Sequence, residues 1–259
     1  MLALTRAVPD ALTACELTHI ERAPIDVARA RAQHADYERL LAALGCEIVE
    51  VPPAHQLPDS VFIEDTAIVF EELAVVTRPG AASRQAETAA VASTLGAYRQ
   101  LQFLTEPATL DGGDVLRLGR TLYVGVGGRT NASGVQQLRD VVSCRGYEVR
   151  SVAVDNCLHL KSAVTEVAPG VVILNPAWID RQVFADHQII EVDPSEPTAA
   201  NVLRVGDATV CAAAYPRTNA RLSAVATVHT VDVSELAKAE GALTCCSLIV
   251  NGSRMNLEP

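Results

Sequence analysis

The chain has few aromatic residues and a single tryptophan. Phe, Trp and Tyr together make up 4% of its 259 residues, whereas apolar residues make up 49%. Its core must therefore be filled mainly by Ala, Val, Leu and Ile. The length is ample for a sizeable core. Because no Pro- or Ser-rich linker divides the sequence, we expect one catalytic domain over residues 1–259.

Basic residues are also scarce. The chain has 21 Lys and Arg against 31 Asp and Glu, a formal net charge of −10. No Lys/Arg cluster could form the basic face of a nucleic-acid binder, so we expect no nucleic-acid partner. No apolar run approaches the roughly 20 residues of a membrane span, so we expect no membrane partner. The opening MLALTRAVPD is interrupted by charges and Pro9, and we expect no targeting signal there.

The seven cysteines are scattered and show neither CxxC nor HxxxH zinc spacing. We therefore expect no structural metal. Their odd number and wide spacing are typical of a reduced, cytoplasmic protein whose thiols are mostly small buried side chains. Cys245 and Cys246 are adjacent and poorly placed to bridge each other, so this pair needs another explanation.

A strand–turn–strand pattern repeats along the chain. Its copies start at Asp65, Asp114, Ser162, Asn201 and Cys246, separated by 49, 48, 39 and 45 residues. Helix-like stretches lie at 24–45, 87–98, 133–146 and 234–241.

The fifth hairpin is incomplete, and we expect the strand-like segment 46–52 to complete it by closing a ring. Closure removes exposed sheet edges. The pattern predicts an α/β propeller of repeated hairpin-plus-helix units with approximate fivefold symmetry. An ordinary doubly wound sheet is the alternative, but the clear hairpins argue against it.

Unusual polar residues occur at the same phase of several repeats, at or just before each hairpin. They are Asp59, Phe62, Glu64 and Asp65 in the first, Asp111 and Asp114 in the second, His159 in the third, and Cys245 in the fifth. If the units are equivalent, these side chains face one central cavity. One cysteine of the pair then points into this polar centre while the other, Cys246, packs into the strand.

The residue types suit a cysteine nucleophile. Such a thiol needs a lowered pKa or a nearby base, and a group that orients the base. Cys245, His159 and Asp111 supply these types from three units. The further carboxylates Glu64 and Asp65 would raise the pKa of the thiol, which makes sense only if the substrate is a cation such as a guanidinium.

Two loop arginines, Arg84 and Arg129, follow glycines after the first and second hairpins. A guanidinium is well suited to bind the carboxylate of an amino-acid substrate. Each residue named so far also has an ordinary structural explanation when taken alone: a buried cysteine, a structural histidine, a turn aspartate or a surface arginine. Their coincidence of phase favours a catalytic cavity.

The chain resembles the guanidine-modifying penteins, and among them the dimethylarginine dimethylaminohydrolases more than the arginine deiminases. The resemblance runs from about residue 24 to Ile249 and is carried, in order, by PDSVFIEDTAIV, RPGAASR, LDGGDVL, VGVGGRTN, LHLKSA and LTCCS. It implies a fivefold α/β propeller that needs no cofactor. Lys161, two residues after His159, departs from the aspartate expected of a deiminase and favours the dimethylarginine branch.

The resemblance also implies residue roles. Cys245 matches the nucleophile, His159 the general acid/base and Asp111 its carboxylate partner. The matching substrate-binding residues are Glu64 and Asp65 for the guanidinium, Asp59, Arg84 and Arg129 for the amino-acid end, Phe62 for the side-chain slot and Leu17 for a lid loop.

The expected reaction is hydrolysis of dimethylarginine to citrulline and an alkylamine through a covalent cysteine thiouronium. The expected partner is a small guanidinium amino acid, and a homodimer is left open. Hydrolysis of arginine or another alkylated guanidine is the first alternative. A silent guanidine- or metal-binding protein is the second, in which Cys245, His159, Glu64 and Asp65 would be the zinc ligands.

Overall fold

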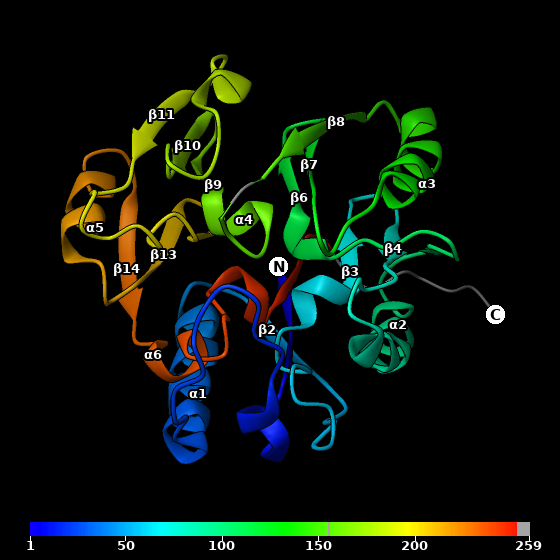
Figure 1. Cartoon of the computed structure of the whole chain (residues 1–259), viewed down its shortest axis with the longest axis horizontal. Helices are drawn as coiled ribbons and strands as arrows, with labels where there is room; N and C mark the ends of the chain where they lie inside the picture. The colour runs from blue at the N-terminus through cyan, green and yellow to red at the C-terminus, as the bar shows by residue number, and fades with distance from the viewer. Residues whose placement is uncertain (155, 253–259) are drawn as a thin grey trace.

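The computed structural model describes residues 1–154 and 156–252, which form five three-stranded sheets around one centre (Figure 1). In each sheet an antiparallel hairpin is followed by a third strand that runs parallel to the second. This arrangement confirms the predicted fivefold α/β propeller. The sheets are β3–β4–β5 (Ala67–Val69, Ala74–Val76, Leu101–Phe103), β6–β7–β8 (Val115–Leu118, Thr121–Val126, Glu148–Ala153), β9–β10–β11 (Val164–Ala168, Val171–Leu174, Gln188–Glu191), β12–β13–β14 (Leu203–Val205, Ala208–Ala212, Thr227–Val231) and β15–β1–β2 (Leu248–Val250, Leu2–Arg6, Glu47–Val51).

Short apolar runs form the strands, and glycines make three of the tight turns between them. Gly119, Gly170 and Gly206 have φ of +61°, +76° and +59°. This left-handed backbone costs a residue with a Cβ but not glycine, so these positions stop one strand and start the next. The predicted hairpins of the second, third and fourth units turn at these glycines, and that of the first unit turns at Glu71 and Glu72.

Ring closure differs from the prediction. The antiparallel partner of β15 is β1, with Leu2 opposite Val250 and Leu4 opposite Leu248. The predicted segment 46–52 forms strand β2 and does lie in this sheet. It pairs in parallel with β1, on the edge of β1 that faces away from β15. The prediction that 46–52 completes the hairpin was therefore wrong. Strand β1 completes the hairpin instead. Its five residues, LALTR, show no hydrophobic periodicity that would have predicted this pairing.

Helical segments join the second strand to the third. Helix α1 (Val27–Ala43) confirms the predicted helix at 24–45: the Asp26 side chain accepts from the N–H of Arg29 at its start, and Gly45 follows its end with φ of +90°. The stretch 234–241 was expected to be a joining helix, but it holds only the single turn α6. The other α-helices are α2 (Thr88–Leu95), α3 (Ala132–Val142), α4 (Leu160–Ala163), α5 (Pro216–Leu222) and α6 (Ser234–Ala237).

Single turns stand at the starts of four of the hairpins. Figure 1 shows α4 and its neighbours drawn together near the centre of the ring. The turns that precede hairpins are η2 (Ile63–Thr66), η4 (Gly112–Asp114), α4 and η7 (Thr244–Cys246), and the remaining 3₁₀ turns are η1 (Asp10–Ala14), η3 (Ala82–Glu87), η5 (Ser143–Arg145) and η6 (Arg181–Phe184). The predicted polar residues thus lie on or beside turns that converge on one place.

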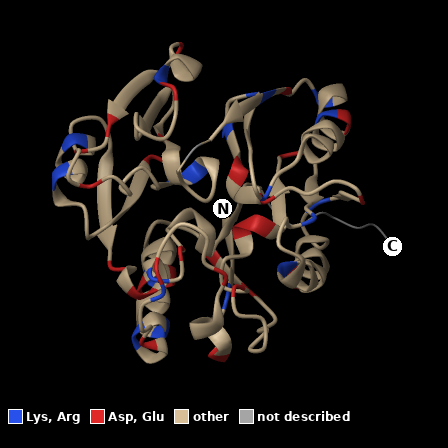
Figure 2. Ribbon diagram, viewed as in Figure 1, with Lys and Arg blue, Asp and Glu red and all other residues tan. Residues whose placement is uncertain are grey.

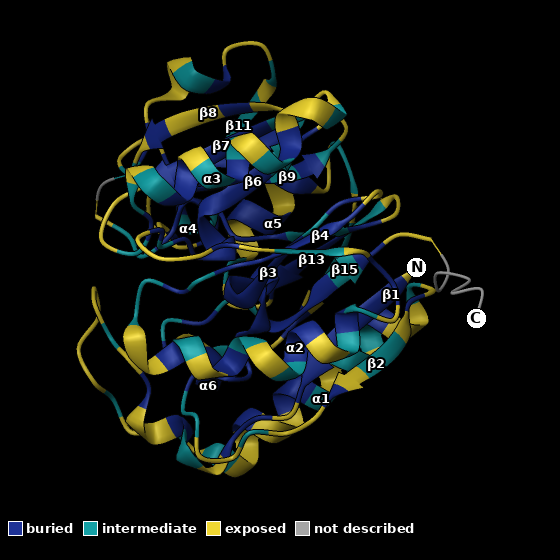
Figure 3. Cartoon of the chain, turned by 90° about the vertical axis from the view of Figure 1, so that its right-hand side faces the viewer, coloured by how far each residue is buried: buried dark blue, intermediate teal, exposed yellow. Residues whose placement is uncertain are grey.

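The core lies between the sheets and the helices that cover them, and the outer faces of these helices are exposed (Figure 3). One cluster joins the two ends of the described chain, since Leu2 and Leu4 of β1 pack with Val250 of β15. Among the described residues, no helix combines the length and apolar character needed to cross a bilayer.

The position of β1 makes a stability prediction. Leu4 is fully buried, so Leu4→Ala should lower the free energy of unfolding by about 2–5 kcal/mol through lost burial and a cavity. Urea unfolding followed by circular dichroism measures it, with Ile20→Ala, whose side chain is 42% exposed, as control. If the two variants lose equal stability, β1 is not part of the core in solution.

Candidate active site

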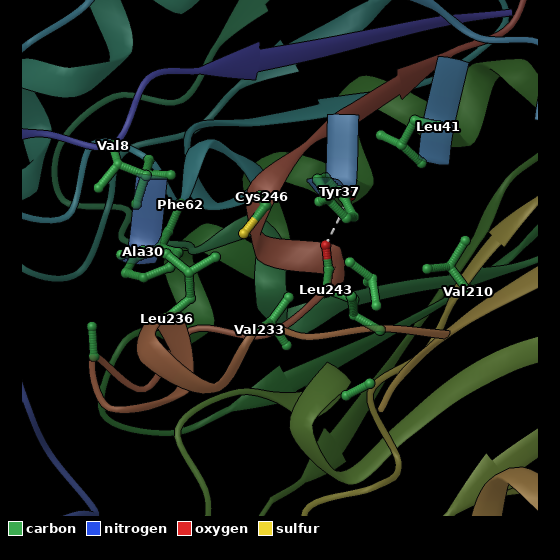
Figure 4. Close-up of a cluster of buried hydrophobic side chains, with 14 of the residues drawn as sticks. Val8, Ala30, Tyr37, Leu41, Phe62, Val210, Val233, Leu236, Leu243 and Cys246 are labelled. Atoms are coloured by element: carbon green, nitrogen blue, oxygen red, sulfur yellow. Dashed lines mark hydrogen bonds between the residues drawn. The ribbon is translucent and has the colours of Figure 1, made fainter. Parts of the chain in front are cut away.

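The two adjacent cysteines have different environments. Cys246 is 1% exposed and packs in an apolar cluster with Tyr37 and Leu243 (Figure 4). The Tyr37 hydroxyl donates to the carbonyl of Leu243 at 3.0 Å and lies 2.7 Å from Oγ of Ser247, so it holds both ends of the η7 turn. Cys245 is half-buried and lines a pocket on the other side. The prediction that one thiol packs and the other faces a polar centre is confirmed.

The pocket around Cys245 is small and strongly polar. Its cavity volume is about 20 Å³, room for little more than one water. A substrate of the size of arginine therefore requires movement at its border. The lining residues are Glu16, Asp59, Phe62, Asp65, Arg84, Arg129, Leu158, His159, Ala239, Glu240, Gly241 and Cys245.

Asp111 lies behind His159 and holds its ring. Nε2 of His159 is 2.9 Å from Oδ2 of Asp111, and both side chains are buried. The N–H of Gly80 donates to the other oxygen of Asp111 at 2.8 Å. With one oxygen fixed by a backbone donor, the second is aimed at the imidazole. Asp111 is therefore placed as the orienting carboxylate that was predicted, although it does not line the pocket itself.

Asp65 is the carboxylate closest to this pair. Its Oδ1 accepts from the N–H of Gly113 at 2.9 Å and is 3.8 Å from Nδ1 of His159. Its Oδ2 accepts from Nη1 of Arg84 at 2.5 Å. Burial raises the pKa of Asp65, but the charges of His159 and Arg84 outweigh burial and lower the pKa to about 2.

The same charges act on the histidine. Burial lowers the pKa of His159. The charge of Asp65 and the hydrogen bond to Asp111 raise it by more, and the resulting pKa is about 10. The ring is therefore an imidazolium at neutral pH. It can donate a proton to a leaving group but is not a free base in the unliganded protein.

The environment also keeps the thiol of Cys245 protonated. Burial raises its pKa well above the usual value for a cysteine, and the charges of Glu64 and Asp65 add to the effect. A free cysteine of pKa about 8.5 is roughly 3% thiolate at pH 7, and Cys245 is less ionised than that. A cation in the pocket would offset these carboxylates, as the sequence predicted for a guanidinium substrate.

The side chains of His159 and Asp65 both approach the backbone of Gly113 closely. A Cβ at this position would lie 2.7 Å from Nδ1 of His159 and 2.8 Å from Oδ1 of Asp65, too close for any side chain. A residue with no side chain is thus a condition for the distance between His159 and Asp65. The second glycine of LDGGD serves the site in this way, beyond turn formation.

Asp114 supports the histidine from behind. Its Oδ1 accepts from the N–H of Leu160 at 3.0 Å and its Oδ2 from the hydroxyl of Thr130 at 2.6 Å. Burial raises the pKa of Asp114 to about 6, while the charge of His159 opposes this shift. Leu160 opens α4 directly after His159, so Asp114 fixes the turn on which the histidine lies.

Arg84 is engaged mainly within the protein. Its guanidinium donates to Asp65, to both oxygens of Glu87 and to the carbonyls of Asp59 and Phe62. The side chain is 6% exposed. It lines the pocket, but these contacts favour a role in holding Asp65. Its predicted binding of a substrate carboxylate stays a prediction.

Glu64 turns away from its neighbour Asp65. Its Oε1 accepts from Nζ of Lys161 at 2.5 Å and its Oε2 from the hydroxyl of Thr244 at 2.8 Å. It lines a larger cavity of about 400 Å³ on the other side of the turns and not the pocket of Cys245. Glu64 therefore acts on the thiol through its charge, and its direct contact with a guanidinium stays a prediction.

The amino-acid end of a substrate has candidates at the pocket border. Asp59 is buried and accepts from the N–H of Glu16 at 3.2 Å, and Arg129 is half-buried and donates to the hydroxyl of Thr18 at 3.1 Å. The ring of Phe62 packs against Gly241, where a Cβ would meet it at 2.0 Å.

The predicted lid residue Leu17 packs on the apolar cluster instead of lining the pocket, while its neighbour Glu16 lines it. Glu240 was not predicted at all. Its carboxylate accepts from the N–H groups of Thr18 and His19 at 2.5 and 2.7 Å, and its φ of +54° is unusual for a residue with a side chain. Glu240 therefore ties residues 18–19 to the pocket border. It precedes the hairpin by too many residues for the repeat to indicate it.

A metal site is the less favoured reading of these residues. One ligand atom each from Asp65, Asp111 and His159 lie within 4.8 Å of one another. Neither Cys245 nor Glu64 belongs to this set. A metal would have to displace the proton of an imidazole whose pKa is about 10, and the carboxylate oxygens already accept hydrogen bonds. Figure 2 shows both acidic and basic positions on the turns near the centre of the ring.

Comparisons with known proteins point the same way. A family model described as N,N dimethylarginine dimethylhydrolase, eukaryotic, matches residues 17–250. An N(G),N(G)-dimethylarginine dimethylaminohydrolase from Streptomyces coelicolor is 43% identical, and 95% of each chain is covered.

Two solved structures are also similar. A cysteine-to-serine mutant of DDAH from Pseudomonas aeruginosa, complexed with citrulline, has a TM-score of 0.90 at 30% identity, covering 95% of this chain and 97% of that one. A dimethylarginine dimethylaminohydrolase with a histidine-to-glycine substitution, in an adduct with S-methyl-L-thiocitrulline, has the same TM-score and identity, covering 95% and 98%.

The contact at Gly113 makes a prediction that involves no titrating group. Gly113→Ala should lower kcat by about 100-fold, because the added methyl pushes His159 and Asp65 apart by a few tenths of an ångström or more. Steady-state kinetics measures it. Gly127→Ala is the control, since a Cβ there meets nothing within 4 Å. Equal activity of the two variants would show that the close approach at Gly113 is irrelevant to turnover.

Proposed function

Because the chain belongs to the dimethylarginine dimethylaminohydrolase family of the guanidine-modifying penteins, we propose that it hydrolyses N-methylated arginine to citrulline and an alkylamine. One observation carries the proposal: Cys245 shares a small pocket with a histidine that Asp111 orients and with the buried carboxylate Asp65. This set offers a nucleophile, a proton donor and a partner for a cation.

Substrate binding starts the reaction in this proposal. The guanidinium enters beside Asp65 and offsets the carboxylate charges that keep the thiol protonated. The thiol of Cys245 then loses its proton to solvent, since His159 is already protonated, and the thiolate forms a C–S bond to the guanidinium carbon. The substrate thus activates its own nucleophile, and the cysteine stays unreactive toward molecules that bring no positive charge.

His159 supplies the proton for the leaving group. The imidazolium donates it to the methylated nitrogen as the C–N bond breaks. Dimethylamine leaves, and a thiouronium remains on Cys245. The neutral imidazole next takes a proton from water as that water attacks the carbon. Cleavage of the C–S bond releases citrulline and the thiolate, and Asp111 keeps the ring aligned throughout.

The two ends of the substrate have separate partners. We assign the α-carboxylate to Arg129, with Arg84 behind it, and the α-amino group to Asp59 and Glu16, since these charges line the pocket border. Phe62 borders the aliphatic part. We propose that residues 18–19, which contact Glu240 and Arg129 at the pocket border, move aside for a substrate that the closed pocket does not admit.

Further proposals follow from the same basis. The chain acts as one catalytic domain over residues 1–259 and works in the cytoplasm, in keeping with the odd number and wide spacing of its cysteines. A homodimer is the proposed assembly. Arginine or another alkylated guanidine is the second candidate substrate, because the pocket's carboxylates recognise the cation and not its methyl groups.

The test is product analysis with asymmetric dimethylarginine, monomethylarginine, arginine and an unrelated guanidine. We expect citrulline and dimethylamine from the first, and a trapped adduct on Cys245 in the intact-protein mass spectrum. Cys245→Ser should abolish turnover, while Cys246→Ser, whose side chain packs away from the pocket and does not line it, should keep most of it.

If only another guanidine gives a product, the substrate assignment is wrong but the proposed hydrolysis through Cys245 still holds. Neither product nor adduct with any of them, from folded protein, would leave a binding protein in place of the enzyme.

The pKa directions make a separate prediction about reactivity. At pH 7 the cationic alkylator 2-chloroacetamidine should label Cys245 much faster than its neutral isostere 2-chloroacetamide, because only the cation stabilises the thiolate. Labelling by the neutral probe should rise only at alkaline pH, above the usual pKa of a cysteine, because burial and the carboxylates raise the pKa of Cys245. Mass spectrometry follows both rates, with Cys245→Ser as blank. Equal rates and equal pH profiles would contradict activation by the substrate's charge.

A further inference from the structure

Four of the five units carry a residue of the proposed site at the start of their hairpins, and the unit that begins with β12 carries none. The equivalent position there is Asn201, two residues before Leu203. Its side chain is buried, with 6% of the residue exposed, and points at the turns of its neighbours. The fourth unit therefore also contributes a buried polar side chain at the centre of the ring.

Asn201 makes three hydrogen bonds to two other units. Its Oδ1 accepts from the N–H of Thr244 at 3.1 Å, and its Nδ2 donates to Oγ1 of Thr244 at 2.9 Å and to the carbonyl of Lys161 at 3.1 Å. The backbone fixes the orientation of this amide, because an N–H can only donate and a carbonyl can only accept. A flipped amide would lose both backbone contacts.

These contacts form part of a closed ring of bonds. The Thr244 hydroxyl receives a hydrogen bond from Asn201 and so donates its own proton to Glu64, whose other oxygen accepts from Nζ of Lys161. The ring returns to Asn201 through the carbonyl of Lys161. It joins η2, α4 and η7, the three turns that place Asp65, His159 and Cys245.

The turn of the nucleophile depends on this support. The η7 turn spans three residues, and Leu243 before it provides no side-chain cap. Asn201 accepts the N–H that opens the turn, so it serves as a cap supplied from another unit. Thr244 immediately precedes Cys245, and Lys161 lies two residues after His159. One side chain thus sets the spacing of the nucleophile and the proton donor.

We propose that Asn201 is a positioning residue for the hydrolysis, which holds the Cys245 turn against the His159 turn without touching the substrate. The inference rests on the proposed function. Removing its amide should let the two turns shift relative to each other while the pocket border, built by other residues, remains. The expected signature is a loss in kcat with little change in KM.

The test compares Asn201→Ala with Asn175→Ala. Asn175 is equally buried, at 4% exposure, and also links separate backbone segments, since it donates to the carbonyl of Pro197 and accepts from the N–H of Ala177, each at 2.9 Å. It lines neither the Cys245 pocket nor the larger cavity. Asn201→Ala should lower kcat by about 100-fold with KM within about threefold, whereas Asn175→Ala should keep kcat.

Labelling of Cys245 by 2-chloroacetamidine gives a readout that does not depend on which guanidine is the substrate. Asn201→Ala should slow it in parallel with kcat, and Asn175→Ala should not. If the wild-type protein hydrolyses no dimethylarginine, the proposed function fails while this comparison still tests Asn201. Kinetics and labelling in Asn201→Ala that match those of Asn175→Ala would overturn the proposal.

Asn201→Asp serves if the alanine variant does not fold. It keeps the shape and the acceptor for Thr244 but loses the donors and adds a carboxylate that shares the Thr244 hydroxyl with Glu64. The labelling rate should therefore fall and its pH profile should move to higher pH. An unchanged profile and unchanged kcat in Asn201→Asp would equally overturn the proposal.

Discussion

The buried carboxylate of Asp65 is the constraint around which the centre is built. A charge that is 2% exposed is costly unless both its oxygens are paired, and the chain meets this cost with Arg84 on one oxygen and with Gly113 and His159 on the other. Arg84 in turn needs Glu87 and two carbonyls, and His159 needs Asp111. These partners come from η3, from η4 and its N-cap, from the loop before η2 and from the start of α4. The hydrogen bonds and ion pairs that the buried Asp65 carboxylate needs therefore decide where the neighbouring side chains lie.

Much of the fold could be predicted because its signals are local. Four hairpins and α1 follow from apolar runs, turn glycines and a helical period within a few residues. The errors concern contacts that no local pattern encodes. Segment 46–52 was given the place of β1, whose partner β15 lies more than 240 residues away in the sequence. Helix α5 was not predicted because PRTNARL is short and polar, and the third unit has only the turn η6 where its neighbours have α-helices.

The site was predictable to the extent that it follows the repeat. Cys245, His159, Asp65 and Asp111 were found by their common phase, and the structure brings them to one place. Side-chain direction was not predictable, since Glu64 and Asp65 are adjacent but face different cavities. The number of partners that Arg84 acquires depends on three-dimensional packing. Glu16 and Glu240 lie off the repeat, and Asn201 lies on it but belongs to a residue type that suggests structure more than catalysis.

The closure of the ring by β1 has a consequence for how the molecule is made. During synthesis β1 leaves the ribosome long before β15, and its antiparallel edge stays open until residues 248–250 follow, so this sheet joins segments that are more than 240 residues apart. Cys245 lies three residues before β15. Cys245 therefore reaches its place in the same late step that seals the propeller. A nascent chain that ends before residue 245 carries His159, Asp65 and Asp111 without this thiol.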